Sequence, residues 1–510
     1  MVALLPQACC SGFCPPVRPP IWTLFMPWPR SNVMSLRHIA LLSVLLTGCA
    51  SFPPQPIELP LNPPAHWHIG AGAGEAVGSR WWYAFGDEEL NRLVDRALSN
   101  NPDLAATAQA VIQADLQLRN AGAALLPTLG ASGSTGKQAS EASGQDRVTS
   151  GSSSLGLSVD YELDLWGRLS AAEAGALAGF QGSEYDYDAA RMTLVASVAS
   201  TWFEWQELQQ RVDIARRNLE LGEKTLALVE ARYRNGVADR SELSRQQTSV
   251  LNLKNEVPPL EYQARQRLAA LRLLTGDYPF TEEIPEAGLL AVQVPEINPE
   301  TPASLVTRRP DLAAEEARLM AASADVEQAR AALMPSMSLS GAVRFSTNSF
   351  LSLADPLQTA NGLLALSQTL FDGGQRRNNV AISESRRVAL LENYRASLLS
   401  AFQEVGDALD REALYLDQEQ RLQSILAQAE ETLRLTEVRY REGADDLLTL
   451  LESQRTVFDA RQQLSQVRMN RLIAAVDLYK ALGGGWQAEP QGRATAPAEV
   501  VRLRPETGPG

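Results

Sequence analysis

Several residue types on which other protein classes depend are scarce in this 510-residue sequence. Of its four cysteines, three (Cys9, Cys10 and Cys14) lie within a leader that ends at the fourth, Cys49. A chain that starts at Cys49 has no partner for an internal disulfide. It keeps two histidines, His66 and His68, in a Pro- and Gly-rich stretch. Metal sites need three or four converging ligands, so we expect a plain linker there and no metal site.

Basic residues are also too few for one large class of partner. The formal net charge is −14, and loss of a leader that contains three arginines and no acid makes the mature chain more acidic still. Binding to phosphate backbones requires clustered Lys and Arg, so we expect no nucleic acid partner. No nucleophile–base pair, metal set or Gly-rich phosphate loop is evident, so we do not expect an enzyme.

Proline is missing from two long stretches, between Pro127 and Pro258 and between Pro356 and Pro490. In the first, apolar residues from Val198 to Tyr233 recur about every 3.5 positions, which is the coiled-coil period. The equivalent seam from Val405 to Tyr440 repeats this spacing but includes Glu412 and Glu419. The sequence therefore predicts very long helices. Their spacing fits a structural coiled coil as well as the wall of a tunnel built from such helices. Pro258-Pro259 is expected to kink or split the helix that returns in the first half.

The chain also repeats itself at an offset of 206–208 residues. Three motifs recur in the same order: Asn101-Pro-Asp-Leu-Ala-Ala106 as Arg309-Pro-Asp-Leu-Ala-Ala314, Ala124-Leu-Leu-Pro127 as Ala332-Leu-Met-Pro335, and Arg232-Tyr-Arg-Asn-Gly236 as Arg439-Tyr-Arg-Glu-Gly443. Two copies of so long a period do not resemble a solenoid. Each half is expected to contain a helix of about 25 residues, two strands, a very long helix, a turn and a returning helix.

Two segments alternate between apolar and small or charged residues, at 152–165 and 336–346. Weaker strands are expected at 128–137 and 363–371, with a polar loop at 139–151. Alternation of this length is typical of a transmembrane barrel strand, although an ordinary half-buried sheet alternates in the same way. Four strands cannot close a barrel, whereas three copies would supply twelve. The expected fold is mostly α with a transmembrane β part, internally duplicated, with four strands and long coiled-coil helices per chain.

The leader has the order of parts found in bacterial lipoproteins. Met34 is the better initiator, Arg37 supplies a positive charge, and a short apolar run precedes Leu46-Thr47-Gly48-Cys49, which matches the lipobox. Cys49 is therefore the expected site of lipidation (palmitate among the attached lipids), and Ala50 after it implies sorting to the outer membrane. The expected segments are 1–33 upstream extension, 34–48 signal peptide, 49–86 lipidated linker, 87–285 first repeat, 286–300 linker, 301–486 second repeat and 487–510 disordered tail.

Several motifs together resemble the TolC-like outer-membrane efflux factors, specifically the OprM-type (NodT-family) lipoproteins that serve RND efflux systems. They are Trp81-Trp82-Tyr-Ala-Phe-Gly-Asp87, Val257-Pro-Pro-Leu260, Leu370-Phe-Asp-Gly-Gly374, the segment from Arg439 to Leu451, and Leu478-Tyr-Lys-Ala-Leu-Gly-Gly-Gly-Trp486. The resemblance implies a homotrimer with a 12-stranded β-barrel in the outer membrane and a 12-helix tunnel in the periplasm. It further implies a passive conduit for small molecules, with a periplasmic adaptor and an inner-membrane RND-type pump as partners, of the kind that confers multidrug resistance.

By the same resemblance, function concentrates at the two helical turns. A periplasmic gate is expected at Arg439, Tyr440, Asp445, Asp446 and Glu452, and an adaptor-docking tip at Arg232, Tyr233, Gly236 and Gly443. Plainer interpretations stay open, since Gly at a turn caps a helix and acids on a helix are often only a solvated face. The alternative function is a periplasmic adaptor lipoprotein, but adaptors have one hairpin flanked by compact β-domains. The exported substrate cannot be predicted from the sequence.

Overall fold

The computed structural model describes residues 66–68, 77–141, 143–144, 146–277, 288–299 and 301–487. The predicted leader, Cys49 and almost all of the predicted tail lie outside these residues, as do parts of both predicted linkers.

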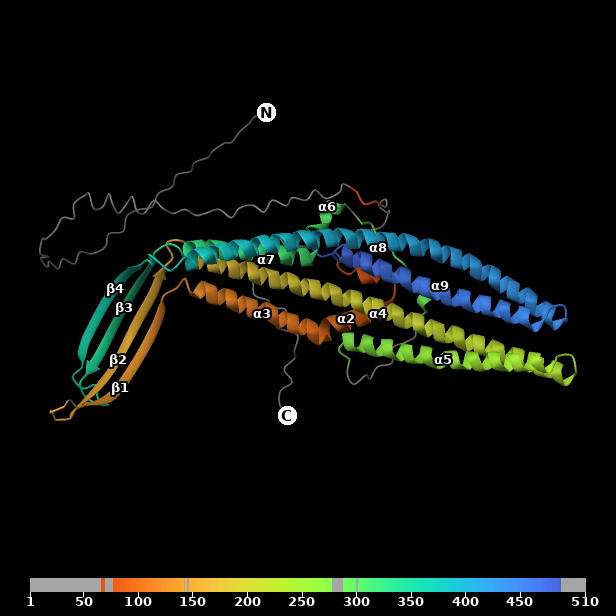
Figure 1. Ribbon diagram of the computed structural model, residues 1–510, viewed down its shortest axis with the longest axis horizontal. Helices are drawn as coiled ribbons and strands as arrows, with labels where there is room; N and C mark the ends of the chain where they lie inside the picture. Colours follow the sequence, from red (N-terminus) through yellow and green to blue (C-terminus); the bar gives the residue numbers. More distant parts are fainter. Residues whose placement is uncertain are drawn as a thin grey trace, which may run out of the picture. The chain divides into compact units, whose positions relative to one another are not determined.

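The described chain consists of two halves built from the same series of elements (Figure 1). The first half comprises η1 (Trp81–Phe85), α2 (Glu88–Asn100), α3 (Pro102–Ala123), β1 (Thr128–Ser140), β2 (Val148–Leu163), α4 (Arg168–Arg234) and α5 (Arg240–Leu274). The second comprises η2 (Leu289–Ala291), α6 (Pro302–Leu305), α7 (Pro310–Ala331), β3 (Ser336–Thr347), β4 (Leu357–Ser367), α8 (Gln375–Arg441) and α9 (Leu447–Ala481).

The matched lengths of the helices confirm the predicted duplication. Helices α3 and α7 have 22 residues each, α4 and α8 have 67 each, and α5 and α9 have 35 each. Helix α4 packs against α3, α5, α7 and α9, so the first half is joined to the second along its long helix. None of the described helices combines the length and the apolar character needed to cross a membrane.

Of the kink or split expected at Pro258-Pro259, the split is wrong, because α5 runs through both prolines as one helix from Arg240 to Leu274, and the kink stays a prediction. A proline inside a helix leaves the carbonyl four residues earlier without its hydrogen bond. Here those earlier residues, Lys254 and Asn255, are exposed, as are the two prolines. Water can therefore hydrogen-bond the freed carbonyls, which lowers the cost of keeping the helix continuous.

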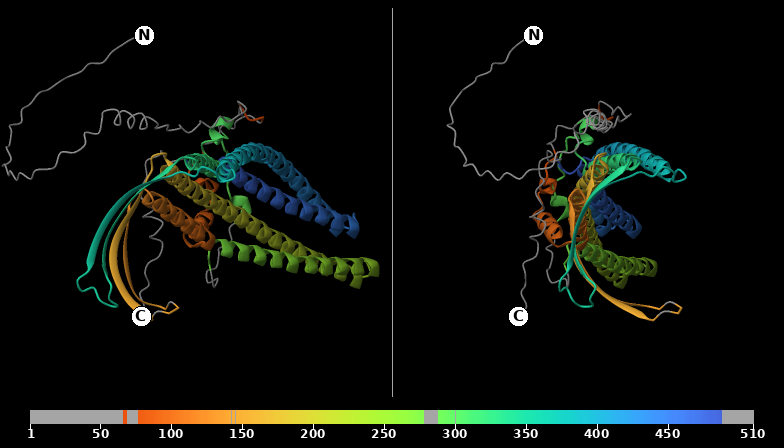
Figure 2. Two further views of the ribbon diagram at one scale, coloured as in Figure 1. Left: turned by 60° about the vertical axis from the view of Figure 1, so that its left-hand side comes forward. Right: turned by 90° about the vertical axis from the view of Figure 1, so that its left-hand side faces the viewer.

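The four strands form one antiparallel sheet in the order β1-β2-β3-β4 (Figure 2). Its register places Leu157 opposite Ala131 on one side and Val343 on the other, so the apolar positions of neighbouring strands share one face. The predicted strands at 128–137, 152–165 and 336–346 are confirmed. The predicted loop at 139–151 is too long, because the β1–β2 ladder continues outward to the pair Ser140 and Val148.

The fourth strand lies earlier than predicted, at 357–367 instead of 363–371. The apolar residues after it, Leu370 and Phe371, belong to the turn into α8 and are almost fully exposed. This turn is held by Asp372, whose carboxylate accepts the backbone N–H groups of Gly374 and Arg376. Local capping of α8 therefore ends the strand where apolar character alone would have continued it.

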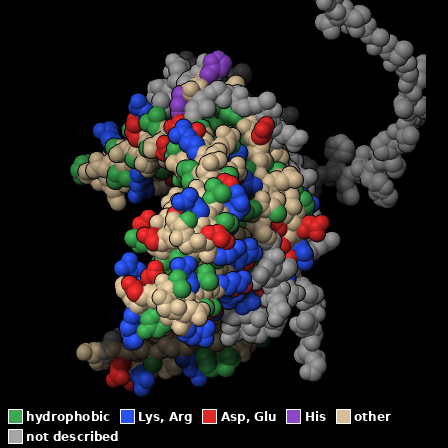
Figure 3. Space-filling model, turned by 90° about the vertical axis from the view of Figure 1, so that its right-hand side faces the viewer, with side chains coloured by type: hydrophobic (Ala, Val, Ile, Leu, Met, Phe, Trp, Pro, Cys, Tyr) green, Lys and Arg blue, Asp and Glu red, His purple; other side chains and the backbone are tan. Residues whose placement is uncertain are grey.

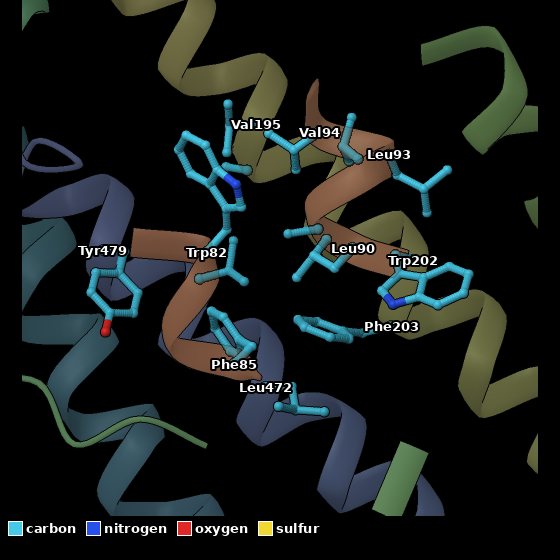
Figure 4. Close-up of a cluster of buried hydrophobic side chains, with 14 of the residues drawn as sticks. Trp82, Phe85, Leu90, Leu93, Val94, Val195, Trp202, Phe203, Leu472 and Tyr479 are labelled. Atoms are coloured by element: carbon cyan, nitrogen blue, oxygen red, sulfur yellow. The ribbon is translucent and has the colours of Figure 1, made fainter. Parts of the chain in front are cut away.

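The largest buried cluster gathers around the segment Trp81–Asp87 (Figure 4). The ring of Tyr479 on α9 stacks on Trp81 with centroids 5.0 Å apart. One carboxylate oxygen of Asp87 caps α2 by accepting the N–H groups of Glu89 and Leu90. The other accepts the indole N–H of Trp202 on α4 at 2.7 Å. This motif therefore fixes the N-terminal part of the first half to both α4 and α9.

The two glutamates predicted on the second-half seam also have structural partners. Glu419 is buried, and its two oxygens accept Arg468 and Arg471 of α9, each at 2.9 Å. Arg471 also lies 3.5 Å from Glu412. The seam between α8 and α9 is therefore held partly by ion pairs, whereas the equivalent positions in the first half are the apolar Trp205 and Val212.

Candidate functional site at the two helical turns

Each long helix ends in a short turn in which glycine has a left-handed backbone. Gly236 follows α4 with φ +75°, and Gly443 follows α8 with φ +80°. The N–H of Gly236 donates to the carbonyl of Tyr233, and the N–H of Gly443 donates to that of Tyr440. Residues with a side chain resist this backbone conformation, so glycine is favoured here. The geometry confirms capped hairpins at both positions, and adaptor docking by these residues stays a prediction.

The returning helices are capped by equivalent aspartates. Asp239 accepts the N–H of Glu242 at the start of α5, and Asp446 accepts the N–H and the hydroxyl of Thr449 at the start of α9, all at 2.8 Å. These hydrogen bonds, with the charge of Arg245, hold the pKa of Asp446 below its usual value. Asp446, predicted as a gate residue, therefore has a capping role in the turn.

Arg439 and Asp445 form an ion pair within the second-half turn. The guanidinium donates to both carboxylate oxygens, at 2.8 and 2.9 Å. Hydrogen bonding to Arg439 lowers the pKa of Asp445. These two predicted gate residues therefore have each other as hydrogen-bond partners within one hairpin.

Tyr440 links the two hairpins. It is 1% exposed and packs with Val229 of α4 and with Leu447 and Leu450 of α9. The guanidinium of Arg232, at the end of α4, lies 4.8 Å from the centre of the Tyr440 ring and donates to the Tyr440 carbonyl at 3.0 Å. Burial raises the pKa of the Tyr440 hydroxyl, opposed in part by the charge of Arg232 and assisted slightly by Glu242.

The matching residues of the two turns have different environments. Tyr233 is equivalent to Tyr440, yet it is 37% exposed. Arg232 is equivalent to Arg439, but Ala238 stands where the second half has Asp445. Arg232 therefore lacks the ion-pair partner that Arg439 has in its own turn, and it contacts the neighbouring hairpin. Comparing the two copies residue by residue would have exposed this difference in the sequence, whereas the Arg232–Tyr440 contact itself was missed.

Glu452 lies apart from this cluster. Its side chain is exposed on α9, and its carbonyl accepts the hydroxyl of Thr456. Its predicted gate role therefore stays a prediction. Viewed from the end at which the turns lie, side chains of both charges are interspersed over the surface (Figure 3). Among the described residues, no three His, Cys, Asp or Glu side chains are grouped so that they could hold a metal ion.

Comparison with known proteins identifies the family. The model of a family described as outer membrane efflux protein matches residues 93–277 and 301–484, one segment in each half. The chain belongs to the outer membrane efflux protein family. Its two matched segments make up well over half of the sequence.

Individual members of the family are similar over nearly their whole length. The pyoverdine export outer membrane protein OpmQ of Pseudomonas aeruginosa is 38% identical over 480 residues, covering 90% of this chain and 99% of that protein. Outer membrane protein OprJ of the same species is 34% identical, covering 88% and 95%. The open-state outer membrane channel MtrE of Neisseria gonorrhoeae is 26% identical with a TM-score of 0.76, covering 84% and 97%.

These similarities place the chain in the outer membrane as an efflux channel component. The predicted resemblance is thereby confirmed, and the channel is favoured over the periplasmic adaptor. The family is one of transport proteins.

Proposed function

We propose that three copies of the chain form the outer-membrane duct of a tripartite efflux pump, a passive conduit for small molecules from periplasm to exterior. In this proposal the three sheets close one 12-stranded barrel and the long helices form a 12-helix periplasmic tunnel. The chain itself performs no catalysis. Its partners are a periplasmic adaptor and an inner-membrane RND-type pump, and lipid on Cys49 adds an anchor.

The observation that carries this proposal is the four-stranded sheet with two open edges and one apolar face. Strands β1 and β4 are each paired on one side within the chain. Leu155, Leu157, Leu364 and Leu366 on one face are all at least half exposed. Lipid offers no hydrogen bonds to an open strand edge, so the edges must pair with other copies. Three copies satisfy both requirements by turning the leucines to lipid and joining each β4 to the next β1.

The helical turns supply a closure for the tunnel. Arg232 joins the first-half hairpin to Tyr440 of the second through a cation–π contact and a hydrogen bond. Contacts of this kind between desolvated groups stabilise by about 1–3 kcal/mol each. They would hold the tip closed until an adaptor and pump displace the hairpins.

Cross-linking tests the assembly. The duplication makes the junction between β4 and the next β1 equivalent to that between β2 and β3, in which Ser158 faces Ala342. By this equivalence, Ala365 faces Ser134 of the next copy on the side away from the leucines. The variant with Ser134→Cys and Ala365→Cys should give a covalent trimer on oxidation in outer membranes, detected by non-reducing electrophoresis and lost on reduction.

The matched control pairs Ser134→Cys with Leu364→Cys, whose side chains point to opposite faces, and it should stay monomeric under denaturation. Cross-linking that stops at dimers, forms open-ended ladders or is equal in the two variants would contradict the closed trimer.

A further inference from the structure

The face of the sheet opposite Leu155, Leu157, Leu364 and Leu366 is lined mostly by small polar residues, with Leu357 and Leu363 of β4 among them and very few charges. Three charged side chains occur on this face of β2 and β3: Asp160, Glu162 and Arg344. Glu162 is neutralised by Arg168 of α4, which binds both of its oxygens at 2.8 Å. Asp160 and Arg344 have no ion pair within the described residues and are both exposed.

Arg344 is placed so that its charge is not shielded by neighbouring side chains. In register, it is flanked by Gly156 on β2 and Thr359 on β4. Gly156 has no side chain, and the Thr359 hydroxyl donates to the backbone carbonyl of Arg344. The guanidinium has no hydrogen-bond partner among the described residues. An exposed arginine without a partner, among neighbours on its face that carry no charge, is available to solutes.

The two unpaired charges lie at different levels of the sheet. Asp160 faces Ser340, four residues before Arg344 on β3, or about 13 Å at the rise of a strand. β2 leads into α4 and β3 follows α7, so Asp160 lies nearer the helices. A solute that leaves the helical part meets Asp160 first and Arg344 later.

We propose that Arg344 is a specificity-determining residue of the exit path, which raises the local concentration of small organic anions carrying carboxylate or phosphate groups. Guanidinium groups match these anions geometrically, and rings of Arg or Lys favour anions in pores. The inference rests on the proposed barrel, in which three copies place Arg344 in a ring facing the lumen. Asp160 forms an opposing cation-favouring ring nearer the periplasm.

A reporter cysteine tests this without depending on the state of the tip. Ala342→Cys lies two residues from Arg344 on the same face, between Ser158 and Asn361, which carry no charge. Intact cells displaying the full-length protein are treated with membrane-impermeant thiosulfonates, one anionic (sulfonatoethyl) and one cationic (trimethylammonioethyl). The measured quantity is the ratio of their labelling rates at residue 342.

Removing the charge by Arg344→Gln should lower the anionic-to-cationic rate ratio several-fold, and Arg344→Glu should lower it further. Arg344→Lys should keep the wild-type ratio. The matched control is Lys137→Gln, which removes a cation from the leucine face, where its ammonium lies 4.7 Å from the centre of the Phe350 ring. It should leave the ratio unchanged.

An equal ratio in Arg344→Gln and the Arg344 protein would overturn the inference while leaving the channel intact. Labelling of Val343→Cys in place of Ala342→Cys would instead show that the leucine face is the wet one. That outcome would overturn the proposed barrel orientation, and the inference with it.

Discussion

Arg232 and Arg439 are matching residues of a duplicated chain, yet only Arg232 reaches across to the neighbouring hairpin. Arg439 forms an ion pair with Asp445 at 2.8 Å, whereas Arg232 has Ala238 at the position that matches Asp445. One acidic side chain therefore decides whether an arginine stabilises its own turn or joins two turns.

Because of this difference, Arg232→Gln should loosen the closed tip more than Arg439→Gln does. Loss of the cation–π contact and of the charged hydrogen bond to Tyr440 removes about 2–4 kcal/mol between the hairpins. Single-channel recordings in planar bilayers should show a higher resting conductance for Arg232→Gln and for Tyr440→Ala. If the resting conductance of Arg232→Gln equals that of the wild type, this contact does not help to close the tip.

A second residue, Glu207 on α4, makes stability depend on pH. It is 3% exposed, one of its oxygens has no hydrogen bond, and Arg211 approaches it only to 3.7 Å. Burial raises the pKa of Glu207 to about 7, opposed in part by Arg211. The unfolded carboxyl ionises near ~4.3, so the unfolded state loses its proton first. The contribution of Glu207 to folding stability is therefore greatest below the pKa of the unfolded carboxyl. It is lost as the pH rises through about 7.

Glu207→Gln should remove this dependence. Its unfolding free energy should exceed that of the wild type by up to about 3 kcal/mol at pH 8 and match it near pH 4. Thermal melts of the purified protein across that range would measure the difference. The control is Glu220→Gln on the same helix, where Glu220 is exposed and pairs with Lys224. This variant should keep the wild-type dependence of the unfolding free energy on pH between pH 6 and 8. A wild-type slope in Glu207→Gln would refute the assignment.

At the scale of elements, the ends of the returning helices are fixed by close backbone contact. After α9, Gly483 has φ +87°, and a Cβ there would overlap the carbonyl oxygen of Arg308. Arg309 reinforces this junction by donating to the carbonyl of Ala481. In the first half, Asn101 likewise donates to the carbonyl of Leu274. The same docking of helix end to helix start therefore occurs in both repeats with different donors.

Gly483→Ala should consequently destabilise the protein by about 3 kcal/mol or more, since it adds overlap to an unfavourable backbone. Gly236→Ala should cost only about 1–2 kcal/mol, because that glycine has a similar φ but open space around it. Chemical denaturation of the two variants would give the difference. Equal losses would mean that backbone strain alone, and not the contact with Arg308, requires glycine at 483.

The elements were predictable to different degrees. The long helices followed from the absence of proline and from the spacing of apolar residues between Val198 and Tyr233. The prolines of α5 were misjudged because their tolerance depends on exposure of Lys254 and Asn255, which a single sequence does not reveal. Alternation predicted which side of β2 is apolar, but the pairing of Leu157 with Val343 is a long-range match that alternation leaves open.

The positions of the two turns were predicted correctly by repetition and resemblance, since Tyr440 and Arg439 lie at the end of α8 as expected. Their partners were not. The contact with Arg232 crosses 208 residues of chain and depends on how the two hairpins pack. The motif Trp81–Asp87 was recognised as typical of the family. The hydrogen bond that its Asp87 accepts from Trp202 became evident only from the fold.

At the scale of the whole molecule, the two faces of the sheet should respond oppositely to charge. Leu157→Arg places a cation on the leucine face and should cost about 2–4 kcal/mol in the bilayer. Ser158→Arg, one residue later on the other face, should be tolerated. The yield of denaturant-resistant trimer in outer-membrane fractions would report both. Equal yields for the two variants would argue against a lipid-facing leucine surface.

The equal lengths of α4 and α8 also constrain how the protein can evolve. Each residue added to a helix advances its end by 1.5 Å and turns it by about 100°. A single insertion in α4 alone would move Arg232 away from Tyr440 in height and around the helix axis. Length changes in the long helices should therefore be accepted only when they arise together in both repeats, so that descendants of the duplication lengthen or shorten in step.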